Sequence, residues 1–244
     1  MGVALLGLGR PDEAESSLRE ALDRRRRTLG EDHPDALRTM VSLGAVLRSQ
    51  DRLTEAEACL RDVLERRTRT LGGDSPESLG SALTLAAVLR AQGKLAEAEP
   101  LVRSALDGRR RTLGEDHVDT LNAAVVLMRL RVDQGHAAEA LETGLRLEPA
   151  ARRLFTKARI TRLAGFLTTL GRARTLVGFD AARFKLAEEN LLEAYRILTS
   201  VTDQLEASLT RECAQALVDL YTAWDKAEPG KGYDAKAAEW KGRF

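Results

Sequence analysis

The sequence repeats one short segment three times at a spacing of 42 residues. The copies read LGEDHPD at 29–35, LGGDSPE at 71–77 and LGEDHVD at 113–119. Alanines keep the same phase at Ala14, Ala56, Ala98 and Ala140. A fixed period of this length is typical of a stacked repeat array, in which each unit buries its apolar face only against its neighbours. Such arrays expose a long concave surface, so the period favours a binding module.

Composition supports helices and narrows the choice of partner. The 244-residue chain is 31% charged and only 4% aromatic, and it is rich in strong helix formers. A formal net charge of +1 gives no bulk attraction for nucleic acid. No apolar run is long enough to span a membrane. The first residues lack the basic region and cleavage site of a signal peptide, so we expect a cytoplasmic protein.

Each 42-residue unit is predicted to hold two helices. Within 34–71, apolar residues recur at helical spacing over 37–47 and again over 56–64, with a short polar turn at 50–52 between them. Strand-like alternation of apolar and polar residues is absent from the sequence. The pattern therefore predicts an all-α solenoid of five to six antiparallel helix pairs with right-handed superhelical curvature.

The repeated segment carries helix stop and start signals. Arginines at 66–69 suit the negative end of the helix dipole, and Gly72 is expected to take a left-handed cap. Asp74 or Ser75 is expected to cap the next helix, with Pro76 preset for its first turn. These signals explain why the connection between units recurs.

One phase of the repeat controls how closely two helices approach. Gly44 and Ala86 occupy this phase in consecutive units, where a small side chain allows close packing. Met128 occupies it in the third unit, so we expect looser or shifted packing there.

The regular repeats cover residues 1–148, and 149–244 form degenerate repeats of the same solenoid. In this second part we expect helices over about 150–176, 181–200 and 205–226, then a closing cap over 235–243. Residues 1–8 supply only the end of a first helix. We therefore expect the chain to be a piece of a longer protein, or its first helix to pack on something else.

These features resemble a known family. Helix pairs with a small residue in the first helix and an alanine in the second are similar to tetratricopeptide repeats. The 42-residue period and the stretches GKLAEAEP at 93–100 and LGEDH at 113–117 resemble the kinesin-light-chain type. The stretches AEENLLEAY at 187–195 and LYTAW at 220–224 resemble it more loosely. The closing pattern resembles the C-terminal repeats of bacterial signalling proteins, some of which carry a serine/threonine kinase domain.

The resemblance implies that a partner peptide binds in the groove lined by the first helix of each pair. The family's asparagine pair is replaced by valine, leucine, serine and threonine at 41–42, 83–84 and 125–126. The expected groove residues are Arg38, Val41, Arg48, Leu83, Arg90, Asn122, Val125 and Arg129. Such a groove suits a segment with acidic residues and apolar anchors. The alternative is that Arg48 and Arg90 only cap helix C-termini or pair with nearby glutamates, and the sequence favours neither role over the other.

Other candidate sites favour structural roles. The arginine run at 24–27 and its copies at 66–67 and 109–111 suggest a basic ridge. Pairing with Glu20, Asp23, Asp62, Glu65 and Asp107 is the favoured explanation. The histidines of the repeated segment lack metal-ligand spacing and are expected to help cap helices. Cys59 and Cys213 lie far apart and are expected to be buried thiols.

We therefore predict a protein-interaction scaffold that has no catalytic step, cofactor or metal and binds neither nucleic acid nor membrane. One alternative is the regulatory or recruiting tail of a larger signalling enzyme, such as a serine/threonine kinase. Another is self-association through unpaired terminal helices. A nucleic-acid role ranks below these. The sequence does not identify the partner.

Overall fold

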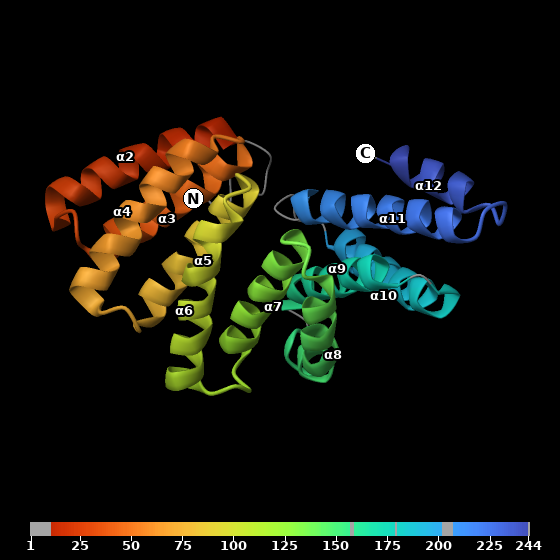
Figure 1. The fold of residues 1–244 in the computed structure, drawn as a ribbon. Coiled ribbons are helices and arrows are strands. Elements are labelled where there is room, and N and C mark those ends of the chain that lie inside the picture. The colour runs from red at the N-terminus through yellow and green to blue at the C-terminus, as the bar shows by residue number, and fades with distance from the viewer. Residues whose placement is uncertain (1–10, 157–158, 179, 202–206, 244) are drawn as a thin grey trace. The chain divides into compact units, whose positions relative to one another are not determined.

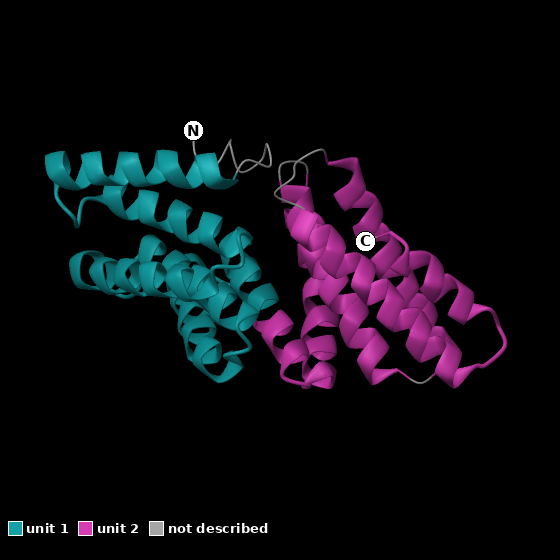
Figure 2. Ribbon diagram, turned by 90° about the horizontal axis from the view of Figure 1, so that it is seen from above, with its two compact units in different colours: residues 1–126 teal, residues 127–244 magenta. Residues whose placement is uncertain are grey.

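The structure, a computed structural model, describes residues 11–156, 159–178, 180–201 and 207–243. All of its regular secondary structure is helical, with no strand in these ranges. The chain divides into two compact units, residues 1–126 and 127–244 (Figure 2). The predicted all-α solenoid of helix pairs is confirmed, whereas the predicted first helix over 1–8 lies outside the described residues.

Unit 1 contains the regular repeats (Figure 1). Its helices are α2 (Pro11–Leu29), α3 (Pro34–Ser49), α4 (Leu53–Leu71), α5 (Pro76–Ala91), α6 (Leu95–Leu113) and the first half of α7 (Val118–Asp133). Consecutive helices from α2 to α6 pack against one another. The core consists of apolar residues recurring at helical spacing, such as Leu37, Leu60 and Leu89. The predicted helix pairs of 34–71 therefore match α3 and α4.

Glycine ends the second helix of each pair, as predicted. Gly30, Gly72 and Gly114 all have positive φ, between 83° and 92°. Gly72 combines φ 86° with ψ 157°, and Gly114 has φ 83° with ψ 168°. This region of backbone space is accessible almost only to glycine and differs from the left-handed helical cap that we expected. An extended ψ directs the chain away from the helix axis into the connection.

The close helix approach predicted at Gly44 is also present. A Cβ atom added at Gly44 would lie only 2.9 Å from Cγ of Leu60 on α4. Leu60 is fully buried. The absence of a side chain at Gly44 thus lets α3 and α4 pack in direct contact.

Unit 2 contains the rest of α7 and five further helices, which are α8 (Ala137–Leu154), α9 (Ile160–Val177), α10 (Ala181–Ser200), α11 (Ala207–Ala227) and α12 (Tyr233–Lys241). Helices α8 to α12 pack consecutively, and α9 also contacts α11. The single helix predicted over 150–176 is wrong. Helix α8 continues through Pro149 as far as Leu154, and α9 begins at Ile160.

Pro149 misled the prediction because proline usually marks a helix boundary. It has no amide hydrogen, so the carbonyl of Leu145 loses its usual helical donor. Leu145 lies on an exposed part of α8, where water can serve that carbonyl instead. The helix ends later, at Phe155, whose side chain is fully buried in unit 2.

Of the looser or shifted packing predicted at Met128, the looser alternative is wrong and the shifted one fits the structure. A Cβ atom added at Gly144 on α8 would lie 3.0 Å from Cε of Met128 and 2.8 Å from Cδ1 of Leu170. Gly144 occupies the phase that Leu60 holds in unit 1. The small and large residues have therefore exchanged helices, which keeps the contact tight.

Aromatic residues hold the final helix, α12, against α10 and α11. Trp224 stacks on Tyr233 with ring centroids 4.2 Å apart, and Tyr195 meets the edge of Trp240 at 4.7 Å. Tyr221 donates to Glu188 at 2.6 Å. The C-terminal cap predicted over 235–243 corresponds to α12, two residues earlier than expected at each end.

Candidate partner-binding groove

Helix caps fix the first helices of the pairs, which carry the predicted groove residues. Nδ1 of His33 accepts from the amide of Asp35 at 3.1 Å, and Oγ of Ser75 accepts from the amide of Ser78 at 3.2 Å. His117 caps α7 as His33 caps α3. The expected capping role of these histidines is therefore confirmed, and Ser75 fills it in the second copy. No cluster of metal-binding side chains occurs among the described residues.

The arginine run stabilises connections between helices. Arg25, Arg67 and Arg109 each donate to the backbone carbonyl ten residues further on, which belongs to Asp35, Glu77 and Asp119 respectively. Other arginines bind carboxylates of the repeated segment, as in Arg69 with Asp32 at 2.9 Å and Arg111 with Asp74 at 2.8 Å.

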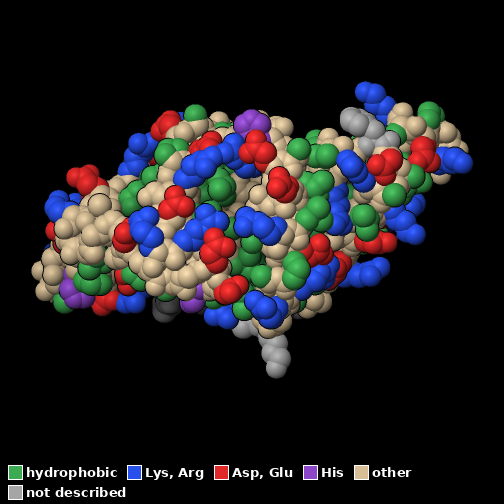
Figure 3. Space-filling model, turned by 60° about the horizontal axis from the view of Figure 1, so that its bottom comes forward, with side chains coloured by type: hydrophobic (Ala, Val, Ile, Leu, Met, Phe, Trp, Pro, Cys, Tyr) green, Lys and Arg blue, Asp and Glu red, His purple; other side chains and the backbone are tan. Residues whose placement is uncertain are grey.

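Part of the ion pairing predicted between the arginine run and nearby carboxylates is present. The pairs Arg24–Glu20, Arg66–Asp62 and Arg110–Asp107 form within helices. Ion-pair partners for the carboxylates of Asp23 and Glu65 are not found in the described part of the chain. Lys and Arg alternate with Asp and Glu over the face drawn in Figure 3, so this face has no extended single-sign field.

A second set of ion pairs joins consecutive second helices. Glu15 on α2 accepts from Arg52 at 2.8 Å, and Glu57 on α4 accepts from Lys94 at 2.8 Å. Burial raises the pKa of Glu15, but hydrogen bonds from Arg52 and Gln50 outweigh it and leave the pKa lowered. The bond from Lys94 is the main cause of the lowered pKa of Glu57. These pairs fix the spacing of the repeats.

The predicted groove residues of unit 1 share one face of each first helix. On α3 this face carries Arg38, Val41, Ala45 and Arg48, and on α5 it carries Gly80, Leu83, Ala87 and Arg90, each set at helical spacing. Alanine and glycine leave the centre of the face shallow. The arginines lie at its ends, so the face combines an open floor with long cationic side chains.

Arg48 has an unusual electrostatic environment. Its side chain is exposed, and no hydrogen bond or ion pair to it is found among the described residues. Although the side chain reaches solvent, the protein packed around its guanidinium is the larger cause that lowers the pKa of Arg48, and the charge of Arg90 adds to it. Two like charges thus come close enough to repel each other. An anion between them would relieve the repulsion and supply the missing hydrogen-bond acceptor.

The remaining predicted residues of unit 1 contribute unequally. Arg38 is exposed and pairs with Asp35 on its own helix. Val41 and Asn122 are half-buried. Leu83 and Val125 are only 8% and 6% exposed, so they act mainly as core residues. Val41 therefore offers more apolar surface than its two repeat equivalents.

Arg129, the eighth predicted residue, lies in unit 2. It forms an ion pair with Glu212 on α11. Arg172 on α9 binds the same carboxylate at 3.3 Å and Asp133 on α7 at 2.9 Å. Sequence reasoning missed this four-residue network because its members do not recur at the 42-residue period. The charges of this network pair with one another, and these ion pairs join α7, α9 and α11.

The thiols offer no reactive centre. Cys213 is buried and Cys59 half-buried, and burial raises the pKa of each to about 11. Each thiol contacts a backbone carbonyl, from Met40 for Cys59 and from Leu191 for Cys213. In the described ranges, none of the helices is long and apolar enough to cross a membrane.

Known proteins share this architecture. The tetratricopeptide repeat family model matches residues 1–69 and 77–153, more than half of the chain. No curated protein matches. Among solved structures, a single-residue variant of the nearly identical TPR-like repeats from a Podosopora anserina protein assigned as a kinesin light chain is 24% identical. It covers 86% of this chain and 93% of its own, with a TM-score of 0.61.

Two more solved structures extend the likeness. Another structure of the Podosopora anserina repeats is 21% identical and covers 94% of this chain and 94% of its own, with a TM-score of 0.55. BtubC (BKLC) from P. vanneervenii is 20% identical and covers 82% of this chain and 77% of its own, with a TM-score of 0.65. At these identities the solved structures show a shared fold. The family match over more than half of the sequence shows that this chain is a member of the tetratricopeptide repeat family.

Proposed function

We propose that this chain is a non-catalytic interaction scaffold whose unit 1 groove docks a partner segment rich in acidic residues. Tetratricopeptide repeats are generally protein-interaction scaffolds, which supports the broad role. The finer proposal rests on one observation. Arg48 lacks an anionic partner among the described residues, and its pKa is lowered first by the protein packed around it and second by the charge of Arg90.

The proposed groove uses Arg38, Val41, Arg48, Leu83, Arg90, Asn122 and Val125. A carboxylate between Arg48 and Arg90 would form charge-assisted hydrogen bonds, which are about twice as strong as neutral ones. Small residues at Ala45 and Ala87 let a peptide backbone approach α3 and α5. Val41 supplies an apolar contact. Arg129 belongs to the unit 2 network and is outside this proposed site.

The test is an affinity capture from a lysate of the source cells, read by mass spectrometry. The native chain is compared with an Arg48→Glu/Arg90→Glu double variant of unchanged helicity. Arg24→Glu is the matched control because Arg24 is exposed on α2 and pairs only within that helix. We expect one protein to be retained by the native chain and the control and lost by the double variant. Equal retention by all three would refute the groove.

The dependence on salt gives a second readout. If charge drives docking, then raising the ionic strength to about 0.5 M weakens retention by the native chain, because exposed charges are screened within a few ångströms. Retention that is insensitive to salt would contradict the acidic-partner proposal. A role as the tail of a signalling enzyme, self-association and a cytoplasmic location stay predictions.

A further inference from the structure

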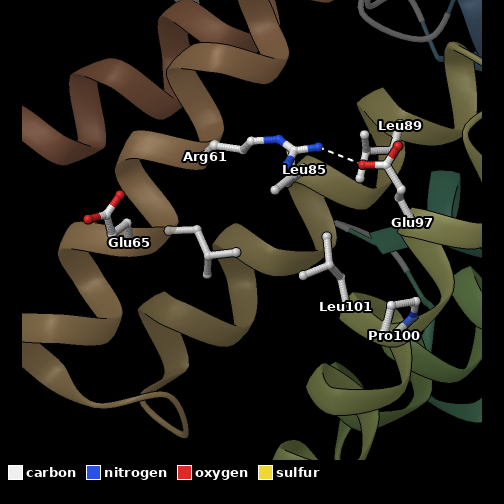
Figure 4. Close-up of a pocket in the computed structure, with 8 residues that line it drawn as sticks. Arg61, Glu65, Leu85, Leu89, Glu97, Pro100 and Leu101 are labelled. Atoms are coloured by element: carbon white, nitrogen blue, oxygen red, sulfur yellow. Dashed lines mark hydrogen bonds and ion pairs between the residues drawn. The ribbon is translucent and has the colours of Figure 1, made fainter.

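Unit 1 has a second hollow surface, on the opposite side of α5 from the groove. A furrow of about 460 Å³ lies between α4 and α6 (Figure 4). Leu85 and Leu89 of α5 form its floor. They lie about 200° around the helix from Leu83 and Ala87 of the groove face, given 3.6 residues per turn. The furrow and the groove are therefore separate surfaces.

Apolar side chains dominate the furrow. Leu64 of α4 and Leu101 of α6 form half-buried walls, and exposed Pro100 completes the α6 side. The volume falls within the range of about 300–1,000 Å³ typical of ligand pockets. The furrow can therefore accommodate large apolar side chains.

Hydrogen-bond acceptors border the furrow. Glu65 is exposed at one end, with no ion pair found among the described residues, and Glu97 lies at the other end (Figure 4). Pro100 has no amide hydrogen, so the carbonyl of Ala96 lacks its usual helical donor. The cation Arg61 is already engaged, because it bonds both Glu57 and Glu97 at 2.7 Å. The available polar groups are thus acceptors, which complement a basic ligand.

The equivalent furrow one repeat earlier differs in charge. It lies between α2 and α4, has a volume of about 360 Å³, and its charged lining residues are Arg19, Asp23, Arg26 and Asp62. The guanidinium of Arg26 donates to Sδ of Met40 at 3.5 Å, and its buried Nε has no hydrogen-bond partner among the described residues. The equivalent position in the larger furrow is Thr68, which is neutral. The two cations of the smaller furrow balance its two carboxylates, whereas the α4–α6 furrow has one cation, Arg61, and two carboxylates, so of these two furrows the α4–α6 furrow better suits a basic ligand.

We propose that the α4–α6 furrow docks a basic amphipathic segment of a partner protein. Its large apolar side chains would lie against Leu64, Leu85 and Leu101, and a Lys or Arg would reach Glu65. The inference does not depend on the proposed groove, since it uses other faces and the opposite charge. One chain could then hold an acidic and a basic segment at the same time.

The test uses a phage library of random 16-residue peptides selected on the full native chain, with counter-selection on a Glu65→Lys variant. We expect enriched peptides that combine large apolar residues with Lys or Arg. The leading peptide is synthesised and its Kd measured by fluorescence anisotropy. We expect Glu65→Lys to weaken binding at least threefold and Leu101→Gln at least tenfold, in variants whose circular dichroism matches the native chain.

Matched controls separate this site from its neighbours. Asp23→Lys makes the same charge change in the smaller furrow, and Arg48→Glu/Arg90→Glu alters the groove. Both should leave the Kd within twofold. Replacing the basic residue of the peptide by Glu should weaken binding to the native chain and restore binding to the Glu65→Lys variant. Enriched peptides without basic residues, failure to enrich any peptide, or equal binding to native chain and Glu65→Lys would overturn the proposal.

Discussion

The glycine at position 44 offers a quantitative test of how the repeats pack. In Gly44→Ala, the new Cβ would lie 2.9 Å from Cγ, 3.0 Å from Cδ2 and 3.2 Å from Cδ1 of Leu60. Leu60 is 0% exposed, so its branched end has no free space to move into. Overpacking of this kind costs about 1–3 kcal/mol. Alanine recovers about 0.5–1 kcal/mol of helix propensity, which leaves a net destabilisation of about 0–2.5 kcal/mol.

Gly80→Ala is the matched control, because no surrounding atom outside the local backbone of α5 lies within 4 Å of a Cβ added there. It should stabilise the chain by about 0.5–1 kcal/mol. The two variants therefore differ by the steric cost alone, about 1–3 kcal/mol. Urea unfolding followed by circular dichroism at 222 nm measures the difference through the midpoint and slope. If Gly44→Ala raised the midpoint as much as Gly80→Ala, the close-packing argument would be refuted.

A double variant checks the same contact from the other side. Leu60→Ala should cost about 2–5 kcal/mol by opening a cavity. In Gly44→Ala/Leu60→Ala the new methyl group partly fills that cavity, so the double variant should be more stable than the sum of the single effects. A coupling below about 0.5 kcal/mol would show that the two residues do not share the contact.

Three further predictions concern titratable side chains. Because the pKa of Glu15 is lowered in the folded chain, the stability that Glu15 contributes is fully present above the unfolded pKa of 4.5 and is lost as pH falls through the folded pKa. In urea titrations below pH 5, the free energy of unfolding of Glu15→Gln should therefore fall less steeply with falling pH than that of the native chain. An equal fall in the two chains would contradict the pairing of Glu15 with Arg52. His33→Ser should raise the free energy of unfolding by up to about 1 kcal/mol, because serine is a strongly preferred N-cap residue and already caps the equivalent helix at Ser75; a lowered free energy of unfolding would contradict an interchangeable capping role at this position. Cys59 and Cys213, with pKa values raised to about 11, should react slowly with iodoacetamide at pH 8 until urea unfolds the chain, and fast labelling of the folded chain would contradict their burial.

Much of unit 1 could be predicted from the sequence because its signals are local and repeated. Helix ends at Gly72 and helix starts at Ser75 follow from stop and cap residues that act within a few positions. The repeat period then places equivalent residues in equivalent surroundings. The proposed groove positions on α3 and α5 came from the resemblance to the family, and the burial of Leu83 and Val125 was not predicted.

The errors occurred where a long-range contact overrides a local signal. Pro149 looked like a boundary, but the helix tolerates it where the freed carbonyl meets solvent. Met128 looked too large for its phase, but Gly144 on the facing helix compensates. The partner of Arg129 is Glu212, 83 residues away in the non-repeating part of the chain. The α4–α6 furrow combines three helices, and no single sequence window contains it.

The ion pairs between repeats affect how such a chain can change in length. The pairs Glu15–Arg52, Glu57–Lys94, Asp32–Arg69 and Asp74–Arg111 each join residues 37 positions apart. Each block of 42 residues therefore carries residues that pair with the preceding block and residues that pair with the following block. Recombination could add or delete a whole block in unit 1 and leave every junction paired. Unit 2 depends on contacts such as Arg129–Glu212 that occur once, so related chains should vary in repeat number within unit 1 only.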